Sequence, residues 1–225
     1  KMSKSKGNVV SPDDLVRDYG CDSLRMYELF VGPPELDAEW DDRGIDGVYR
    51  FLNRVWNLVM DSKDADVKAT KEMIKIRNKM VYDITTRLES FSLNTVISGF
   101  MEYNNKLIDI AKKEGGIDKE TLSTFAVLLA PFAPHMAEEL WQQLGHEGTV
   151  FNAGWPTYDE DAMKDDEIEV AVQINGKTRA VVTVPADVSK EDAIKAGKEA
   201  VADKLTGTIV KEIYVPGRII NIVQK

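Results

Sequence analysis

The spacing of apolar residues changes once along this chain of 225 residues, near residue 165. Between residues 45 and 145, apolar side chains recur at steps of three and four, which is the period of helices with one buried face. From residue 168 onward, apolar and polar residues alternate, which is the period of strands. The change predicts a multidomain protein, with a mainly α-helical bundle over residues 45–158 and a small α+β domain over residues 166–225.

Local signals place the elements before the bundle. Ser11-Pro12-Asp13-Asp14 is typical of a helix start, because a hydroxyl caps the helix, proline fits its first position and acids favour its first turn. Pro33-Pro34 forces an extended break further on. We therefore expect residues 1–44 to form a separate segment that ends before the long helices.

The α+β domain is predicted from its turns. Asn175-Gly176 is a strong signal for a type I′ hairpin turn between two strands. A helix starting near Ser189 follows, and a second hairpin turns at Pro216-Gly217. The predicted order is ββαββ.

Composition excludes several classes of protein. No window approaches the 18 or so uninterrupted apolar residues of a membrane helix. A single cysteine, Cys21, excludes an internal disulfide, and with two histidines it makes a zinc finger implausible. We expect a cytoplasmic protein without a membrane partner and without a metal site.

The net charge of −9 disfavours a nucleic-acid partner at first sight, because proteins that bind RNA usually carry basic surface. Much of the acidity is local, however. Residues 116–165 contain two basic against nine acidic residues, so other segments are free to present basic faces.

The first residues carry the clearest chemical signal. Lys1, Lys4 and Lys6 are separated by small or hydroxylated residues. Lysines on such a loop can close over a polyphosphate and supply cations where negative charge develops. A solvated basic tail is the alternative interpretation of this pattern.

The string Lys1-Met2-Ser3-Lys4-Ser5 resembles the KMSKS loop of class I aminoacyl-tRNA synthetases, and the resemblance extends along the whole chain to the leucyl-tRNA synthetase family, bacterial type. Further strings carry it: Met26 to Glu35, Glu39-Trp40, Pro131 to Trp141, Val172 to Arg179 and Val215 to Arg218. The resemblance implies a helical anticodon-binding-type domain followed by a C-terminal tRNA-binding domain.

The resemblance also implies the chemistry. Members of the family use ATP, with Mg²⁺, to activate leucine as an adenylate and transfer it to tRNA(Leu). It assigns the main catalytic role to Lys4, then Lys1, with Met2, Ser3 and Ser5 shaping the ATP-binding loop. Because the nucleotide-binding fold is missing from these 225 residues, the chain alone is expected to be inactive. We also expect a monomer.

Candidate tRNA contacts come from two places. One set is Lys71, Lys75 and Lys79, which are four positions apart and so align along one side of a predicted helix. They either contact tRNA phosphates or form a solvated helix face. Lys177 and Arg179 follow the Asn175-Gly176 turn, where they are expected to pair with Ile174 and Val172 on the apolar face of the sheet. Such cations either extend from the edge of the core or form a binding surface. Arg218, after the other turn, is a weaker candidate.

Other functions stay open at this point. The chain could be a free-standing tRNA- or RNA-binding module without catalysis, or a purely structural interaction module. It could also be a fragment of an isoleucyl or valyl enzyme. The isoleucyl enzyme is disfavoured because one cysteine cannot build its C-terminal zinc site. The valyl enzyme is disfavoured because its coiled-coil arm needs a heptad repeat that we do not find in this sequence. His135, at a predicted helix start, is interpreted as an ordinary first-turn polar residue.

Overall fold

The computed structural model describes residues 2–41, 43–164 and 167–225, with the backbone alone for Lys4. It divides into two units, Lys1–Met163 and Lys164–Lys225. We call them the helical unit and the sheet unit. The prediction of a mainly helical chain with a small sheet is confirmed.

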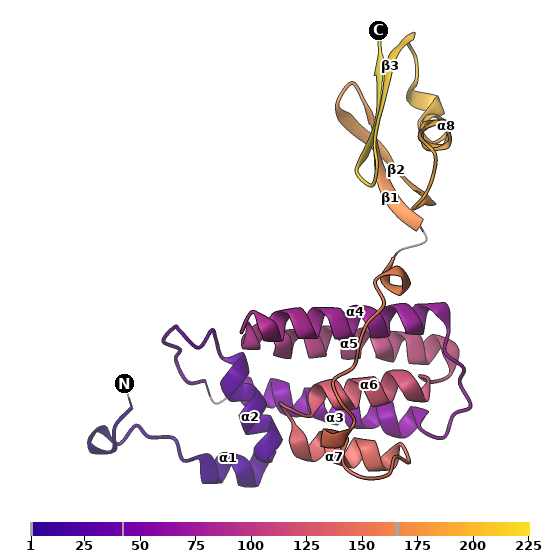
Figure 1. Ribbon diagram of the computed structural model, residues 1–225. Helices are drawn as coiled ribbons and strands as arrows, with labels where there is room; N and C mark the ends of the chain where they lie inside the picture. Colours follow the sequence, from indigo (N-terminus) through magenta and orange to yellow (C-terminus); the bar gives the residue numbers. More distant parts are fainter. Residues whose placement is uncertain (1, 42, 165–166) are drawn as a thin grey trace. The chain divides into compact units, whose positions relative to one another are not determined.

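The helical unit is built from α-helices of 8 to 22 residues (Figure 1). They are α1 (Pro12–Tyr19), α2 (Cys21–Phe30), α3 (Gly44–Ser62), α4 (Lys71–Glu89), α5 (Leu93–Glu114), α6 (Lys119–Leu129) and α7 (Pro134–Gln143), with short 3-10 turns η1 (Lys4–Lys6), η2 (Val150–Asn152) and η3 (Asp161–Met163). The predicted start of α1 is confirmed, since the Ser11 hydroxyl accepts a hydrogen bond from the Asp13 N–H at 3.3 Å.

The apolar stripes of these helices form one core. Its centre is aromatic, because the Phe100 ring lies edge-on to the rings of Phe125 and Phe132. Met26 and Tyr27 of α2 are buried in the same core, so this part of the first 44 residues packs with the long helices. Gly44 permits that packing, because a Cβ there would lie 2.5 Å from the Tyr27 ring.

A buried carboxylate joins α2 to α7. Asp22 accepts hydrogen bonds from the Met136 N–H at 2.7 Å and from Nδ1 of His135 at 2.8 Å. The first turn of α7 has no cap from its own preceding residue, Ala133. Asp22 therefore caps α7 from another helix, and its negative charge lies at the positive end of the helix dipole.

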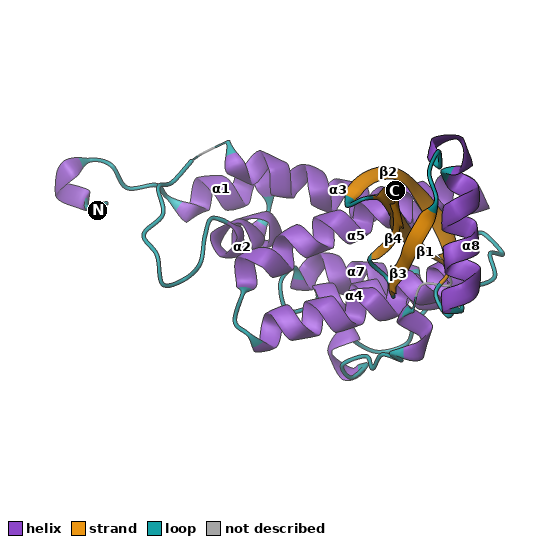
Figure 2. Ribbon diagram, turned by 90° about the horizontal axis from the view of Figure 1, so that it is seen from above, coloured by secondary structure: helices purple, strands orange, loops and turns teal. Residues whose placement is uncertain are grey.

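The sheet unit has strands β1 (Glu167–Ile174), β2 (Lys177–Pro185), β3 (Ile209–Val215) and β4 (Ile219–Gln224), with α8 (Lys190–Ala200) between β2 and β3 in sequence. The sheet order is β2-β1-β4-β3, with β1 and β4 parallel. Figure 2 shows α8 beside the sheet. The buried side chains of β1 and β4 pack with those of α8 and form a separate core.

The predicted turn between the first two strands is confirmed. Asn175 and Gly176 both have positive φ, 49° and 79°, as a type I′ turn requires. The Asn175 side chain bonds the backbone of Gln224, accepting from its N–H at 2.9 Å and donating to its carbonyl at 3.1 Å. The turn is thereby tied to the end of β4.

Within the described ranges, no helix is long and apolar enough to cross a membrane.

Replacing Asp22 by alanine should destabilise the helical unit by about 1–2 kcal/mol, because the Met136 N–H loses its acceptor. Asp22→Asn keeps one acceptor oxygen and should lose less. Thermal and urea unfolding of the 225-residue chain measure both effects. Asp14→Ala, which removes an exposed carboxylate paired with Arg17, is the matched control and should change stability little. Equal losses for Asp22→Ala and Asp14→Ala would contradict this account.

The stability of the helical unit should also depend on His146. Its ring stacks on Trp141 with centroids 3.8 Å apart and hydrogen-bonds the Ser123 hydroxyl. Burial, and then the charge of Lys119, lower the pKa of His146 below its usual value. The unfolded chain therefore binds the proton more readily, and stability should fall as the pH drops below about 6.5.

Urea unfolding between about pH 5.5 and about pH 7.5 measures this dependence. His146→Gln should flatten it, because glutamine does not titrate. The same pH slope in both proteins would contradict the assignment to His146.

Candidate nucleic-acid interface

The N-terminal loop is folded into a turn by its own polar side chains. The Ser3 N–H donates to Oδ1 of Asn8 at 2.9 Å, and the Ser3 and Ser5 hydroxyls lie 3.2 Å apart. The Lys6 N–H closes the turn onto the Ser3 carbonyl at 3.1 Å, and Gly7 has a φ of 65°. Sequence reasoning missed Asn8, although Gly7-Asn8 is a typical turn signal.

The remaining loop residues are placed as follows. Met2 is 44% exposed and lines a hollow of about 220 Å³ with Pro33, Pro34 and Trp40. Lys1 lies outside the described residues, and Lys4 is described by its backbone in η1. The two predicted catalytic lysines therefore stay predictions.

The second candidate set lies on α4. Thr70 caps this helix, since its hydroxyl accepts from the Met73 N–H at 3.2 Å. Lys71 is exposed in the first turn, and Lys75 and Lys79 follow it as half-buried residues. Partial burial means that these two side chains do not belong to a fully solvated face.

The side of α4 next to the lysine row contacts α5. Lys113 of α5 pairs with Glu72 at 3.0 Å. The Tyr103 hydroxyl donates to the Asp83 carboxylate, and burial, then this hydrogen bond, raise the pKa of Tyr103. These contacts join α4 to α5 beside the lysine row, and the row itself follows from the four-residue spacing on the helix.

The third set follows the turn of the sheet unit, and here one expectation is wrong. Lys177 pairs with Ile174 as predicted, but Val172 pairs with Ala180 and not with Arg179. A β-bulge between Val172 and Gln173 leaves Arg179 as the extra, unpaired residue of β2. The regular alternation of side chains between the two faces of the sheet is interrupted there, so Arg179 is not assigned to the apolar face. Its carbonyl accepts from Nζ of Lys204 at 3.2 Å.

Arg218 lies at the other turn, at the opposite end of β4. Its N–H donates to the Val215 carbonyl at 3.0 Å, and its carbonyl accepts from the Ala171 N–H at 3.3 Å. Ala171 is three positions from Ile174, the partner of Lys177, and three positions correspond to about 10 Å along the strand. Lys177, Arg179 and Arg218 are all exposed and belong to the same unit.

No group of three or more histidine, cysteine or acidic side chains in the described part of the chain could hold a metal ion. The chemistry that these sites offer is cationic and hydroxylic, which suits phosphate ligands.

Two protein families match the chain. The anticodon-binding domain of tRNA ligase matches residues 70–194, and the tRNA synthetases of class I (I, L, M and V) match residues 1–41. The first match covers α4 to α7 and continues into α8, and the second covers the N-terminal loop, α1 and α2.

Individual relatives match from end to end. The leucine–tRNA ligase of Fervidobacterium nodosum is 47% identical over 242 residues, which include 100% of this chain and 30% of the relative. That of Thermosipho melanesiensis is 44% identical, again over 100% of this chain and 30% of the relative. The chain thus spans about a third of the length of these relatives.

A solved structure has the same fold. In the ternary complex of Agrobacterium radiobacter K84 agnB2 LeuRS with tRNA and LeuAMS, the matching part has a TM-score of 0.82 and 30% identity, covering 100% of this chain and 31% of that chain. The predicted resemblance is confirmed: this chain belongs to the tRNA ligases with an anticodon-binding domain, and its whole length is similar to the C-terminal part of leucine–tRNA ligases.

Proposed function

We propose that this chain is the part of a leucine–tRNA ligase that supplies the phosphate-binding loop and the contacts to the body of tRNA(Leu). The observation that carries the proposal is the similarity of the whole chain to leucine–tRNA ligases, at 47% and 44% identity. The complete enzyme would activate leucine with ATP and Mg²⁺ and transfer it to tRNA(Leu). We also propose a monomer located in the cytoplasm.

The loop would act on the phosphates of ATP. Lys4, and next Lys1, would stabilise the negative charge that develops as pyrophosphate leaves, since fixed cations there favour the transition state. Ser3 and Ser5 would hold the loop in shape, supported by the Asn8 side chain, and Met2 would fix its base. The turn closed by Ser3 and Asn8 supports this role because it orders the loop backbone.

The tRNA body would meet both units. We infer that residues 45–158 form a helical bundle of the anticodon-binding type, that residues 166–225 form a ββαββ tRNA-binding domain and that residues 1–44 are the loop and stem-contact segment. Lys71, Lys75 and Lys79 would contact phosphates from the first, and Lys177, Arg179 and Arg218 from the second. The bulge supports a role for Arg179, because it frees this side chain from the packed face of the sheet.

The isolated 225-residue chain should bind tRNA(Leu) with an affinity that falls steeply as salt rises, because each neutralised phosphate releases counterions. Gel-shift titrations over a range of salt concentrations give the slope of log affinity against log salt. The double variant Lys177→Ala, Arg179→Ala should reduce this slope by about 2. Lys190→Ala with Lys195→Ala, two exposed lysines of α8, is the matched control. An affinity that does not respond to salt would indicate a structural interaction module instead.

The same chain should not charge tRNA(Leu) with leucine, because its described residues form no nucleotide-binding fold that would hold ATP and leucine. Incorporation of labelled leucine into tRNA, with ATP and Mg²⁺ present, measures this. Charging above the protein-free background would refute the claim that the chain is inactive on its own.

A further inference from the structure

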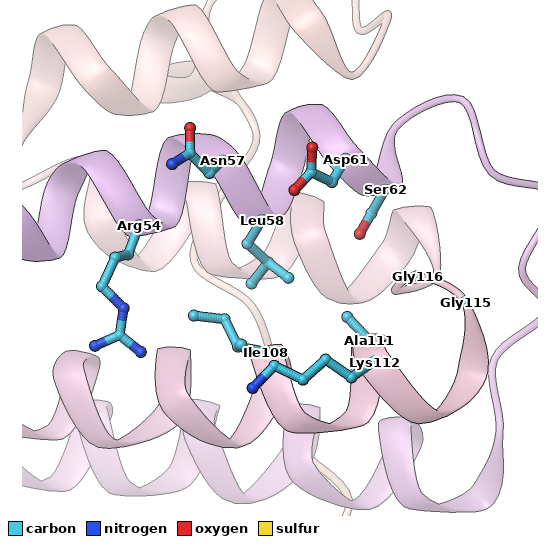
Figure 3. A pocket seen from close by; sticks show the side chains of 10 residues that line it. All are labelled: Arg54, Asn57, Leu58, Asp61, Ser62, Ile108, Ala111, Lys112, Gly115 and Gly116. Carbon is cyan, nitrogen blue, oxygen red and sulfur yellow. The ribbon is translucent and has the colours of Figure 1, made fainter.

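A groove runs between α3 and α5 in the helical unit. Its volume is about 450 Å³, and its floor is apolar, formed by Leu58 of α3 with Ile108 and Ala111 of α5. The helices run in the same direction here, as Figure 3 shows, so both end near Gly115 and Gly116. This site shares no residue with the loop, the α4 lysines or the sheet unit.

One end of the groove contains a buried hydroxyl without a hydrogen-bond partner among the described residues. It is the Oγ of Ser62, a residue that is 2% exposed. In Figure 3 this oxygen points into the space between the helices. A Cβ at Gly116 would lie 3.6 Å from it and 3.2 Å from Ala65 and Val67, so the glycine leaves this space open.

The two ends of the groove differ in charge. Asp61 lies beside Ser62, and the last carbonyls of α3 and α5 add negative partial charge at the same end. The other end holds the guanidinium of Arg54, and Lys112 runs back toward it to pair with Asp109 at 3.1 Å. Arg54 and Asp61 are seven positions apart, which is about 10 Å along a helix.

We propose that this groove binds an elongated zwitterion, an aliphatic chain with an ammonium group at one end and a carboxylate at the other. The ammonium would lie at the negative end and donate to the Ser62 hydroxyl and the Asp61 carboxylate. The carboxylate would pair with Arg54, and the aliphatic chain would cover Leu58, Ile108 and Ala111. This site is separate from the proposed tRNA contacts and does not depend on them.

The probe that fits this description is 8-aminooctanoate, whose charged groups lie a comparable distance apart when the chain is extended. Titration into the ¹⁵N-labelled 225-residue chain should shift the amide signals of Ala111, Gly115 and Gly116. 8-Aminooctanoate should bind at least about threefold more tightly than octanoate or octylammonium, because each of these carries only one of the two charged groups. Equal binding of the three probes, shifts confined to other residues or no saturable shift would each overturn the proposal.

Variants test the two ends separately. Arg54→Gln should bind 8-aminooctanoate no more tightly than octylammonium, and Asp61→Asn no more tightly than octanoate. Arg50→Gln and Asp64→Asn, nearby exposed residues that do not line the groove, should leave binding unchanged. Because all four side chains are exposed, the variants should keep the melting temperature of the parent chain. Equal effects of Arg54→Gln and Arg50→Gln would contradict a specific site.

Discussion

The attachment of the N-terminal segment to the helical core depends on the buried carboxylate of Asp22. It satisfies the first turn of α7 from the start of α2, and it hydrogen-bonds the ring of His135. Met26 and Tyr27 then continue α2 into the core, where Gly44 makes room for the tyrosine ring. The N-terminal loop precedes this segment in sequence and is joined to it through α1.

The parts of the fold that could be predicted are those set by neighbours in sequence. The Ser11 cap and the Asn175-Gly176 turn depend on local backbone preferences, and both are found where predicted. The contact between Asp22 and His135 could not be predicted, because 113 residues separate the two. The register at Arg179 was also missed, since a bulge responds to packing across the sheet and has no signal in a single sequence.

The distribution of charge is compatible with the polyanionic partner that we propose for this acidic chain. Part of the acidity of residues 116–165 is matched inside the helical unit, where Arg77 pairs with Glu120 at 2.8 Å and lies 3.5 Å from Asp118. The exposed cations of the turns in the sheet unit lie outside that acidic segment. Net charge is therefore a poor guide to partners here, whereas the local density of charge is a useful one.

The most direct test of the central claim uses the leucine–tRNA ligase of Fervidobacterium nodosum, with its aligned part replaced by this chain. The rate of tRNA(Leu) leucylation is the measurement. We expect the chimera to charge tRNA(Leu) and Lys4→Ala to lower the rate by about a hundredfold or more, with a smaller effect of Lys6→Ala. A folded chimera that does not charge tRNA(Leu), or equal effects of the two substitutions, would contradict the account.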